Sequence, residues 1–229
     1  MMRLGLLGGT FNPVHNCHLK VAAQTRDALA LDRILFIPAG DPPHKAPDSL
    51  APARHREAMV RLAIEEEPSF GLSDMEVRRP GRSYSIDTVR ALRAELGPTP
   101  HLFFIIGLDA FLDLPSWKEA EALLRACHFV VVSRPRTRFE QLLSMPLFRH
   151  ADRGKIHALD SGLAHRLSVP IPDGSELTLL RLPPCDISAS EIRQSVRQGR
   201  SLANVLPLSV ESYIIQQGLY SEDDDRTGS

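Results

Sequence analysis

The chain has 229 residues, of which 43% are hydrophobic and 24% are charged, and these ordinary proportions exclude wholesale disorder and a fibrous protein. Its 27 lysines and arginines balance 28 acidic residues, so the net charge of -1 gives no support to a surface that coats nucleic acid or anchors to a membrane. No apolar run is long enough for a membrane span, and the N-terminus is unlike a signal peptide. We therefore expect a cytoplasmic protein without nucleic-acid or membrane partners, and the sequence leaves open whether it forms a homo-oligomer.

The cysteine content predicts free thiols. Cys17, Cys127 and Cys185 are too few and too widely spaced along the chain for a disulfide framework. Their odd number favours reduced thiols in a reducing compartment.

Short apolar runs, rich in β-branched or aromatic residues and ended by glycine or proline, predict buried parallel strands. They lie at residues 4–7, 34–37, 102–106, 129–132 and 177–182. Between the strands, apolar residues at helical spacing predict helices at 18–29, 54–66, 86–96 and 117–126. This alternation is typical of an α/β fold, which we expect to be a Rossmann-like, doubly wound parallel sheet.

The C-terminal third has a different character. Residues 146–174 are rich in histidine, aspartate, glycine and proline, and we expect an irregular insertion there. Helical patterns follow at 188–198 and 210–217. We expect one continuous domain that consists of an α/β part at 1–185, a small helical part at 186–220 and a disordered tail at 221–229.

The first strand runs into the segment GGTFNPVHNCH at residues 8–18, and a helix follows. Glycines after a strand let backbone N–H groups approach a ligand, and the N-terminus of the next helix favours an anion. His15 and His18 flank that helix start, where imidazoles can donate hydrogen bonds to phosphate oxygens. Two other readings stay open, a plain tight turn and a metal site made by His15, Cys17 and His18, which has no fourth ligand in view.

Two further segments place polar groups where an open α/β sheet binds its ligands. After the second strand, the segment PPHK puts Lys45 at the mouth of the sheet. After the strand at 102–106, Asp109 follows Gly107, and the run continues to Trp117, the single tryptophan. Taken alone, Lys45 is an ordinary solvated lysine and Trp117 an ordinary core aromatic.

Two predicted helix starts carry hydroxyl groups. Ser85 lies in the segment SYSIDT, where its hydroxyl is a plausible helix cap. Ser188 and Ser190 lie in the segment ISASEIR, and Arg193 follows one turn later. Hydroxyl groups, free N–H groups and a guanidinium suit carboxylate or polyphosphate oxygens, although each segment alone is also an ordinary cap.

These motifs, in this order along residues 3–218, resemble those of the nicotinate-nucleotide adenylyltransferases, which belong to the nucleotidyltransferase superfamily with the (H/T)xGH signature. Three positions depart from the family pattern. Cys17 stands where the family usually has glycine, Gly40 where asparagine is common, and Ser190 where threonine is usual. The exchange at Ser190 keeps the hydroxyl, whereas the sulfur of Cys17 adds bulk beside the two histidines.

The resemblance implies that the chain transfers AMP from ATP to nicotinate mononucleotide, giving deamido-NAD and pyrophosphate, with Mg²⁺ bound to ATP and no dedicated metal site. It implies that His15 and His18 are catalytic, and that Ser85, Trp117 and Arg134 bind the mononucleotide. The implied ATP-binding residues are Gly8, Gly9, Thr10, Phe11, Lys45, Gly107, Asp109, Ser188, Ser190 and Arg193.

Alternatives remain at this point. The nearest alternative is an adenylyltransferase that prefers nicotinamide mononucleotide, although a carboxylate suits the helix start at Ser85 better than an uncharged amide does. Pantetheine-phosphate adenylyltransferases share the first histidine motif, but the Trp117 region and the added length argue against them. A nucleotide-binding regulator without catalysis and a small metal-binding protein are the alternatives from other classes.

Overall fold

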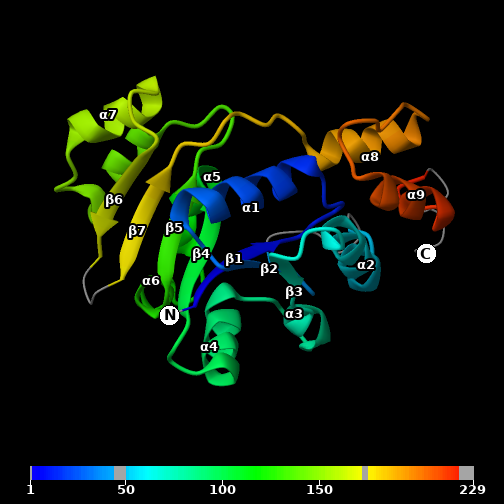
Figure 1. Ribbon diagram of the computed structural model, residues 1–229, viewed down its shortest axis with the longest axis horizontal. Coiled ribbons are helices and arrows are strands. Elements are labelled where there is room, and N and C mark those ends of the chain that lie inside the picture. The colour runs from blue at the N-terminus through cyan, green and yellow to red at the C-terminus, as the bar shows by residue number, and fades with distance from the viewer. Residues whose placement is uncertain (1, 44–49, 172–174, 222–229) are drawn as a thin grey trace. The chain divides into compact units, whose positions relative to one another are not determined.

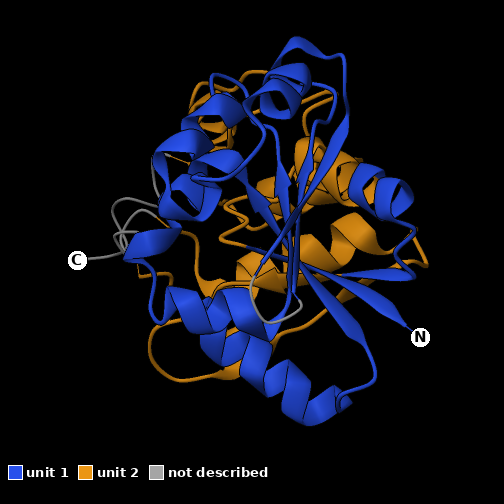
Figure 2. Ribbon diagram, turned by 90° about the vertical axis from the view of Figure 1, so that its left-hand side faces the viewer, with its two compact units in different colours: residues 1–8, 24–34, 84–185 blue, residues 9–23, 35–83, 186–229 orange. Residues whose placement is uncertain are grey.

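The computed structural model describes residues 2–43, 50–171 and 175–221. By its internal contacts the chain divides into two compact units, which are coloured separately in Figure 2. Unit 1 comprises residues 1–8, 24–34 and 84–185, and unit 2 comprises residues 9–23, 35–83 and 186–229. The predicted division of the chain at residue 186 stays a prediction, and nearly all of the predicted tail, from residue 222 on, lies outside the described residues.

Seven strands of the described chain form one sheet in the order β3-β2-β1-β4-β5-β7-β6. Their bounds are Arg3–Gly9 (β1), Arg33–Pro38 (β2), Phe70–Leu72 (β3), His101–Gly107 (β4), His128–Val132 (β5), Arg166–Pro170 (β6) and Glu176–Leu180 (β7). β1, β4, β5 and β7 pair in parallel, and β6 runs antiparallel to β7 at the edge. The mostly parallel sheet confirms the predicted α/β fold.

The core of unit 1 is made by the apolar residues that predicted its strands. In the parallel register, Leu6 lies beside Phe104, and Ile106 lies beside Val131. These side chains are almost completely buried, as expected for parallel strands that are covered on both faces. Gly5 belongs to the same layer, where a Cβ would collide with the side chain of Ile34.

The helices follow or connect the strands (Figure 1). The longer ones are Asn16–Leu29 (α1), Ala53–Ile64 (α2), Ser85–Leu96 (α4), Ala120–Ala126 (α6), Arg153–Ser161 (α7), Ala189–Arg197 (α8) and Leu208–Gln216 (α9). The short ones are Met75–Arg78 (α3), Leu108–Leu112 (α5) and the 3₁₀ turns Leu114–Ser116 (η2), Phe139–Ser144 (η3) and Pro146–Phe148 (η4). The six predicted helices are confirmed to within about three residues at their ends.

The expectation of an irregular insertion at residues 146–174 is wrong, because this segment contains η4, α7 and β6. Asp152 caps α7, since its carboxylate accepts the N–H groups of Gly154 and Lys155 at 2.9 and 3.2 Å. Gly162 ends the helix with a φ of 81°, a conformation that glycine adopts without strain. These cap signals were present in the sequence, but only two buried residues, Ile156 and Leu159, make up the apolar face.

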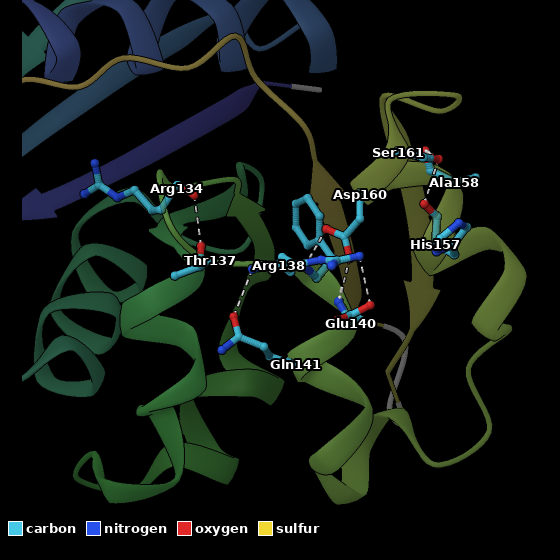
Figure 3. Close-up of polar contacts among 10 residues, drawn as sticks. Arg134, Thr137, Arg138, Glu140, Gln141, His157, Ala158, Asp160 and Ser161 are labelled. Carbon is cyan, nitrogen blue, oxygen red and sulfur yellow. Dashed lines mark hydrogen bonds and ion pairs between the residues drawn. The ribbon is translucent and has the colours of Figure 1, made fainter.

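The same segment is tied to η3 by a buried carboxylate. Asp160 on α7 accepts the N–H groups of Phe139 and Glu140 at 2.8 and 2.9 Å. Figure 3 shows Asp160 beside Glu140 and Arg138. The side chain of Asp160 is only 7% exposed, and Arg138 lies at 3.9 Å from it. The carboxylate thus satisfies two N–H groups at the start of η3.

Two local predictions need correction. The helix predicted to start at Trp117 begins at Ala120, because Glu119 adopts a left-handed conformation with a φ of 50° that interrupts it. Ser85 is not the cap of α4 but its first residue, since Tyr84 occupies the N-cap position and makes no side-chain cap bond.

The cysteines differ from one another. Cys127 is a free, buried thiol, and burial raises the pKa of this thiol to about 12. Cys17 and Cys185 are disulfide-bonded. The expectation of reduced thiols is therefore wrong for these two residues, because the number and spacing of cysteines do not determine which of them form disulfides.

In unit 2, the C-terminal helix α9 packs against α2 (Figure 1). His55 and Tyr213 join them through a hydrogen bond of 2.9 Å between Nδ1 and the hydroxyl. The hydroxyl of Ser209 donates to the carbonyl of Leu62 at 3.3 Å. Across the described residues, no helix is both long and apolar enough to cross a membrane.

Candidate active site

The two predicted catalytic histidines, His15 and His18, lie close together. His15 ends a segment, residues 9–15, that the sequence predicts to bind the nucleotide and that we call the nucleotide loop for this reason. His18 lies in the first turn of α1. The rings of His15 and His18 have centroids 3.8 Å apart, and Phe11 lies edge-on to His18 at 5.0 Å. The backbone N–H of His15 donates to Nδ1 of His18 at 3.2 Å. Because Nδ1 accepts this bond, the neutral ring carries its proton on Nε2, which is therefore a hydrogen-bond donor.

The nucleotide loop is anchored by Asn12, which the sequence did not single out. Its Oδ1 accepts the N–H of Ala51 at 3.0 Å and the hydroxyl of Tyr220 at 2.8 Å. Its carbonyl accepts Nη1 of Arg193 at 2.8 Å. Asn12 is 5% exposed, so these bonds are made away from water. The position of Asn12 inside the motif was the available signal, but its partners are far away in the sequence.

The start of α8 carries the predicted polyphosphate ligands of unit 2. Ser188 is the N-cap residue, yet its hydroxyl makes no cap bond and lies 2.6 Å from that of Ser190. The first N–H groups of α8 are therefore not satisfied by this side chain, and such groups favour an anion. Arg193 follows one turn later and, through Asn12, ties α8 to the nucleotide loop.

In unit 1, the end of β4 brings Gly107, Asp109 and Arg134 together. Nε of Arg134 lies 3.5 Å from Oδ1 of Asp109. A Cβ on Gly107 would lie 2.5 Å from that oxygen and 2.6 Å from Nε, so a larger residue at this position would displace the two side chains from this arrangement. The carbonyl of Arg134 accepts the hydroxyl of Thr137 at 3.1 Å, which fixes the turn after β5 (Figure 3).

The other predicted mononucleotide ligands of unit 1 are Ser85 and Trp117. Trp117 is half-buried and lies edge-on to Phe104, with ring centroids 6.4 Å apart. The next residue, Lys118, donates to Asp87 at 2.9 Å, and its Nζ lies 4.7 Å from the centre of the Tyr84 ring. Lys118 thus ties the segment of Trp117 to the N-terminus of α4, where Ser85 lies.

The predicted site residues are divided between the two units. Unit 2 contains Gly9, Thr10, Phe11, His15, His18, Ser188, Ser190 and Arg193. Unit 1 contains Gly8, Ser85, Gly107, Asp109, Trp117 and Arg134. Lys45 lies outside the described residues. Among the residues that are described, no group of three or more His, Cys, Asp and Glu side chains is arranged to hold a metal ion, His15 and His18 included.

Comparison with known proteins gives a consistent result. The family model described as Cytidylyltransferase-like matches residues 6–195. A protein of Geobacter metallireducens named "Probable nicotinate-nucleotide adenylyltransferase" is 46% identical over 97% of this chain and 100% of its own length. A protein of the same name from Geobacter sulfurreducens is 45% identical over 97% and 100% of the two chains.

Solved structures support the fold. The nicotinic acid mononucleotide adenylyltransferase of Plasmodium falciparum, complexed with NaAD, superposes with a TM-score of 0.71 at 19% identity, over 96% of this chain and 98% of that one. The same enzyme complexed with APC gives a TM-score of 0.69 over the same shares of the two chains. The likeness confirms the Rossmann-like character that was expected of the sheet.

Proposed function

The chain belongs to the nicotinate-nucleotide adenylyltransferase family, and we propose that it transfers the adenylyl group of ATP to nicotinate mononucleotide, releasing pyrophosphate and forming deamido-NAD. The observation that carries the proposal is the likeness to a protein of this name over 97% of this chain and the full length of that protein. The paired imidazoles of His15 and His18 after β1 support it, because they suit a reaction at phosphorus.

The reaction needs no general base. The attacking phosphate of the mononucleotide has a second pKa of about 6, so it is largely ionised near neutral pH. Its oxygen bonds to the α-phosphorus of ATP while the bond from that phosphorus to the bridging oxygen breaks, and pyrophosphate leaves with the electron pair. The protein therefore contributes alignment and charge stabilisation. The Nε2 proton of His18, directed by the bond at Nδ1, is suited to the α-phosphate oxygens as negative charge accumulates there.

The remaining ATP contacts follow from the residue types. Ser188, Ser190 and the first N–H groups of α8 are suited to the β- and γ-phosphates, with Arg193 one turn later. Lys45 is assigned to the triphosphate from its motif alone. Mg²⁺ enters as part of the MgATP substrate, held mainly by phosphate oxygens and water.

The mononucleotide ligands are assigned to unit 1. The flat face of Trp117 is suited to stacking on the pyridine ring. The first turn of α4, beginning at Ser85, offers N–H groups that favour a carboxylate over an uncharged amide, which favours the acid substrate. Asp109 is suited to sugar hydroxyls, and Arg134 beside it to the phosphate.

A substrate panel tests the reaction. With MgATP, the purified chain is expected to release pyrophosphate with nicotinate mononucleotide at a kcat/KM at least about tenfold higher than with nicotinamide mononucleotide. Equal or reversed preference contradicts the assignment of the acid and supports the amide alternative. Binding of ATP with no pyrophosphate release from either mononucleotide contradicts catalysis and supports a nucleotide-binding regulator.

The catalytic assignment has its own test. His18→Ala removes the Nε2 donor, so kcat is expected to fall by about 100- to 1,000-fold. His157→Ala is the matched control, because His157 is exposed on α7. If His18→Ala turns over nicotinate mononucleotide at the unmodified rate, the role of His18 is wrong.

A further inference from the structure

Arg56 is a buried charge in unit 2 that neither the motifs nor the proposed reaction uses. It lies in the first turn of α2 and is 1% exposed. Among the residues that the structure describes, its hydrogen-bond partners are all backbone carbonyl oxygens, with no carboxylate. They are those of Ala51 at 2.9 Å from Nε, Thr10 and Ala39 at 2.8 and 2.6 Å from Nη1, and Gly40 at 2.8 Å from Nη2.

These carbonyls belong to three separate segments. Thr10 lies in the nucleotide loop, Ala39 and Gly40 follow β2, and Ala51 precedes α2. A guanidinium has its donors in a fixed planar fork, so the four bonds hold the three segments in one arrangement. Burying such a charge is costly, and a packed apolar side chain would be cheaper for stability alone. The arrangement therefore favours a role beyond stability.

The bonds also fix the direction of the neighbouring N–H groups. In a planar trans peptide, a carbonyl and the N–H of the next residue point in opposite directions. The Ala39 carbonyl points at Arg56, and the N–H of Gly40 accordingly donates to Oγ of Ser83 at 3.0 Å. By the same geometry, the bond to Thr10 turns the N–H of Phe11 away from the guanidinium.

We propose that Arg56 is a positioning residue for MgATP. Its guanidinium sets the backbone of the nucleotide loop and of the segment after β2. Its charge, which has no carboxylate among the hydrogen-bond partners in the described part of the chain, adds positive potential at both. This rests on the proposed function, since the nucleotide loop is assigned to ATP there. Arg56 touches neither substrate in this scheme and acts through Thr10, Phe11 and Gly40.

The test compares Arg56→Met and Arg56→Lys with the control Arg61→Met. Arg61 lies on the same helix, is 64% exposed and pairs with Glu57 at 2.7 Å. The dissociation constant of MgATP is measured by calorimetry, and the KM of each substrate by pyrophosphate release, well below the melting temperature of each variant. Circular dichroism establishes that each variant is folded.

Arg56→Met is expected to weaken MgATP binding by roughly 30-fold or more, while the KM of nicotinate mononucleotide changes by less than about threefold. Arg56→Lys is expected to recover part of the affinity, because it keeps the charge but cannot reach four carbonyls at once. Arg61→Met is expected to bind MgATP as the unmodified chain does.

The proposal is overturned if folded Arg56→Met binds MgATP within about threefold of the unmodified chain, or if both substrates lose affinity by the same factor. If Arg56→Met does not fold, Arg56→Lys is judged by the same two criteria. Failure of the proposed function is seen separately, as an unmodified chain that binds MgATP but adenylylates neither mononucleotide. The calorimetric comparison does not depend on that turnover.

Discussion

The two units hold their candidate ligands in different ways. In unit 2, the nucleotide loop is held by buried hydrogen bonds that its own Asn12 accepts from Ala51 and Tyr220. Arg56 adds a bond to the carbonyl of Thr10 in the same loop. In unit 1, the segment of Trp117 is held at the start of α4 by Lys118 and Asp87, whose side chains are 41% and 32% exposed. Removing a buried partner leaves backbone groups unsatisfied, whereas an exposed ion pair exchanges its partner for water. Substitutions of the residues that hold the nucleotide loop are therefore expected to be more damaging than substitutions of the residues that hold the segment of Trp117.

Among the substitutions that test this comparison, Asn12→Ala is expected to have the largest effect. It removes the acceptor of the bonds from Ala51 and Tyr220, both made by a buried side chain, so the free energy of unfolding is expected to fall by about 2–4 kcal/mol. Urea denaturation measures the change. Asn16→Ala is the control, because this substitution removes an exposed hydrogen bond from the Asn16 side chain to the carbonyl of Asn204. It is expected to lower the free energy of unfolding by less than about 1 kcal/mol. Equal losses in the two variants would contradict the comparison.

Trp117→Ala tests the mononucleotide ligands assigned to unit 1. Loss of the stacking face is expected to raise the KM of nicotinate mononucleotide by about 10- to 100-fold while the KM of MgATP stays within about threefold. Steady-state kinetics with each substrate varied in turn measures both values. Trp117→Phe keeps a flat ring and is expected to restore part of the affinity. An unchanged KM for the mononucleotide in Trp117→Ala would remove Trp117 from the pyridine site.

The fold was predictable wherever its signal is local. Buried strands such as residues 102–106 are visible because an apolar run acts within a few residues. The glycines Gly8 and Gly9, which were expected to follow the first strand, are its last two residues. The helix α7 was missed because a nine-residue helix with two buried positions gives a weak period. The roles of Asn12 and Arg56 could not be predicted, since they depend on partners far away in sequence, such as Tyr220, 208 residues from Asn12.

The half-buried His128 of unit 1 is intermediate in exposure between the buried groups that hold the nucleotide loop and the exposed ion pair of Lys118. Nδ1 of His128 accepts the N–H of Glu176 at 3.1 Å, and its Nε2 lies 3.2 Å from Nδ1 of His101. Burial, and then the neighbouring His101, lower the pKa of His128, so folding favours the neutral ring. Its contribution to stability is present above the unfolded pKa of about 6.5 and is lost as the pH falls toward the lower native pKa.

The melting temperature is therefore expected to fall between pH 7.5 and pH 5.5, and by less in His128→Gln, whose amide oxygen can still accept from Glu176. His150→Gln is the control, because His150 is exposed, and it is expected to show the same pH dependence as the unmodified chain. If His128→Gln leaves the pH dependence unaltered, the proton uptake belongs to another group.

Lys118→Met is the smallest expected effect. The ion pair with Asp87 and the contact with the Tyr84 ring are both half-exposed, so their loss is expected to lower the free energy of unfolding by less than about 1 kcal/mol. Because salt screens exposed charges, the difference between Lys118→Met and the unmodified chain is expected to shrink when the salt concentration is raised to about 1 M. Urea denaturation at low and high salt measures both. A loss of unfolding free energy above about 2 kcal/mol that salt does not change would contradict the comparison, since only a desolvated ion pair resists screening. The segment of Trp117 would then be held as firmly as the nucleotide loop.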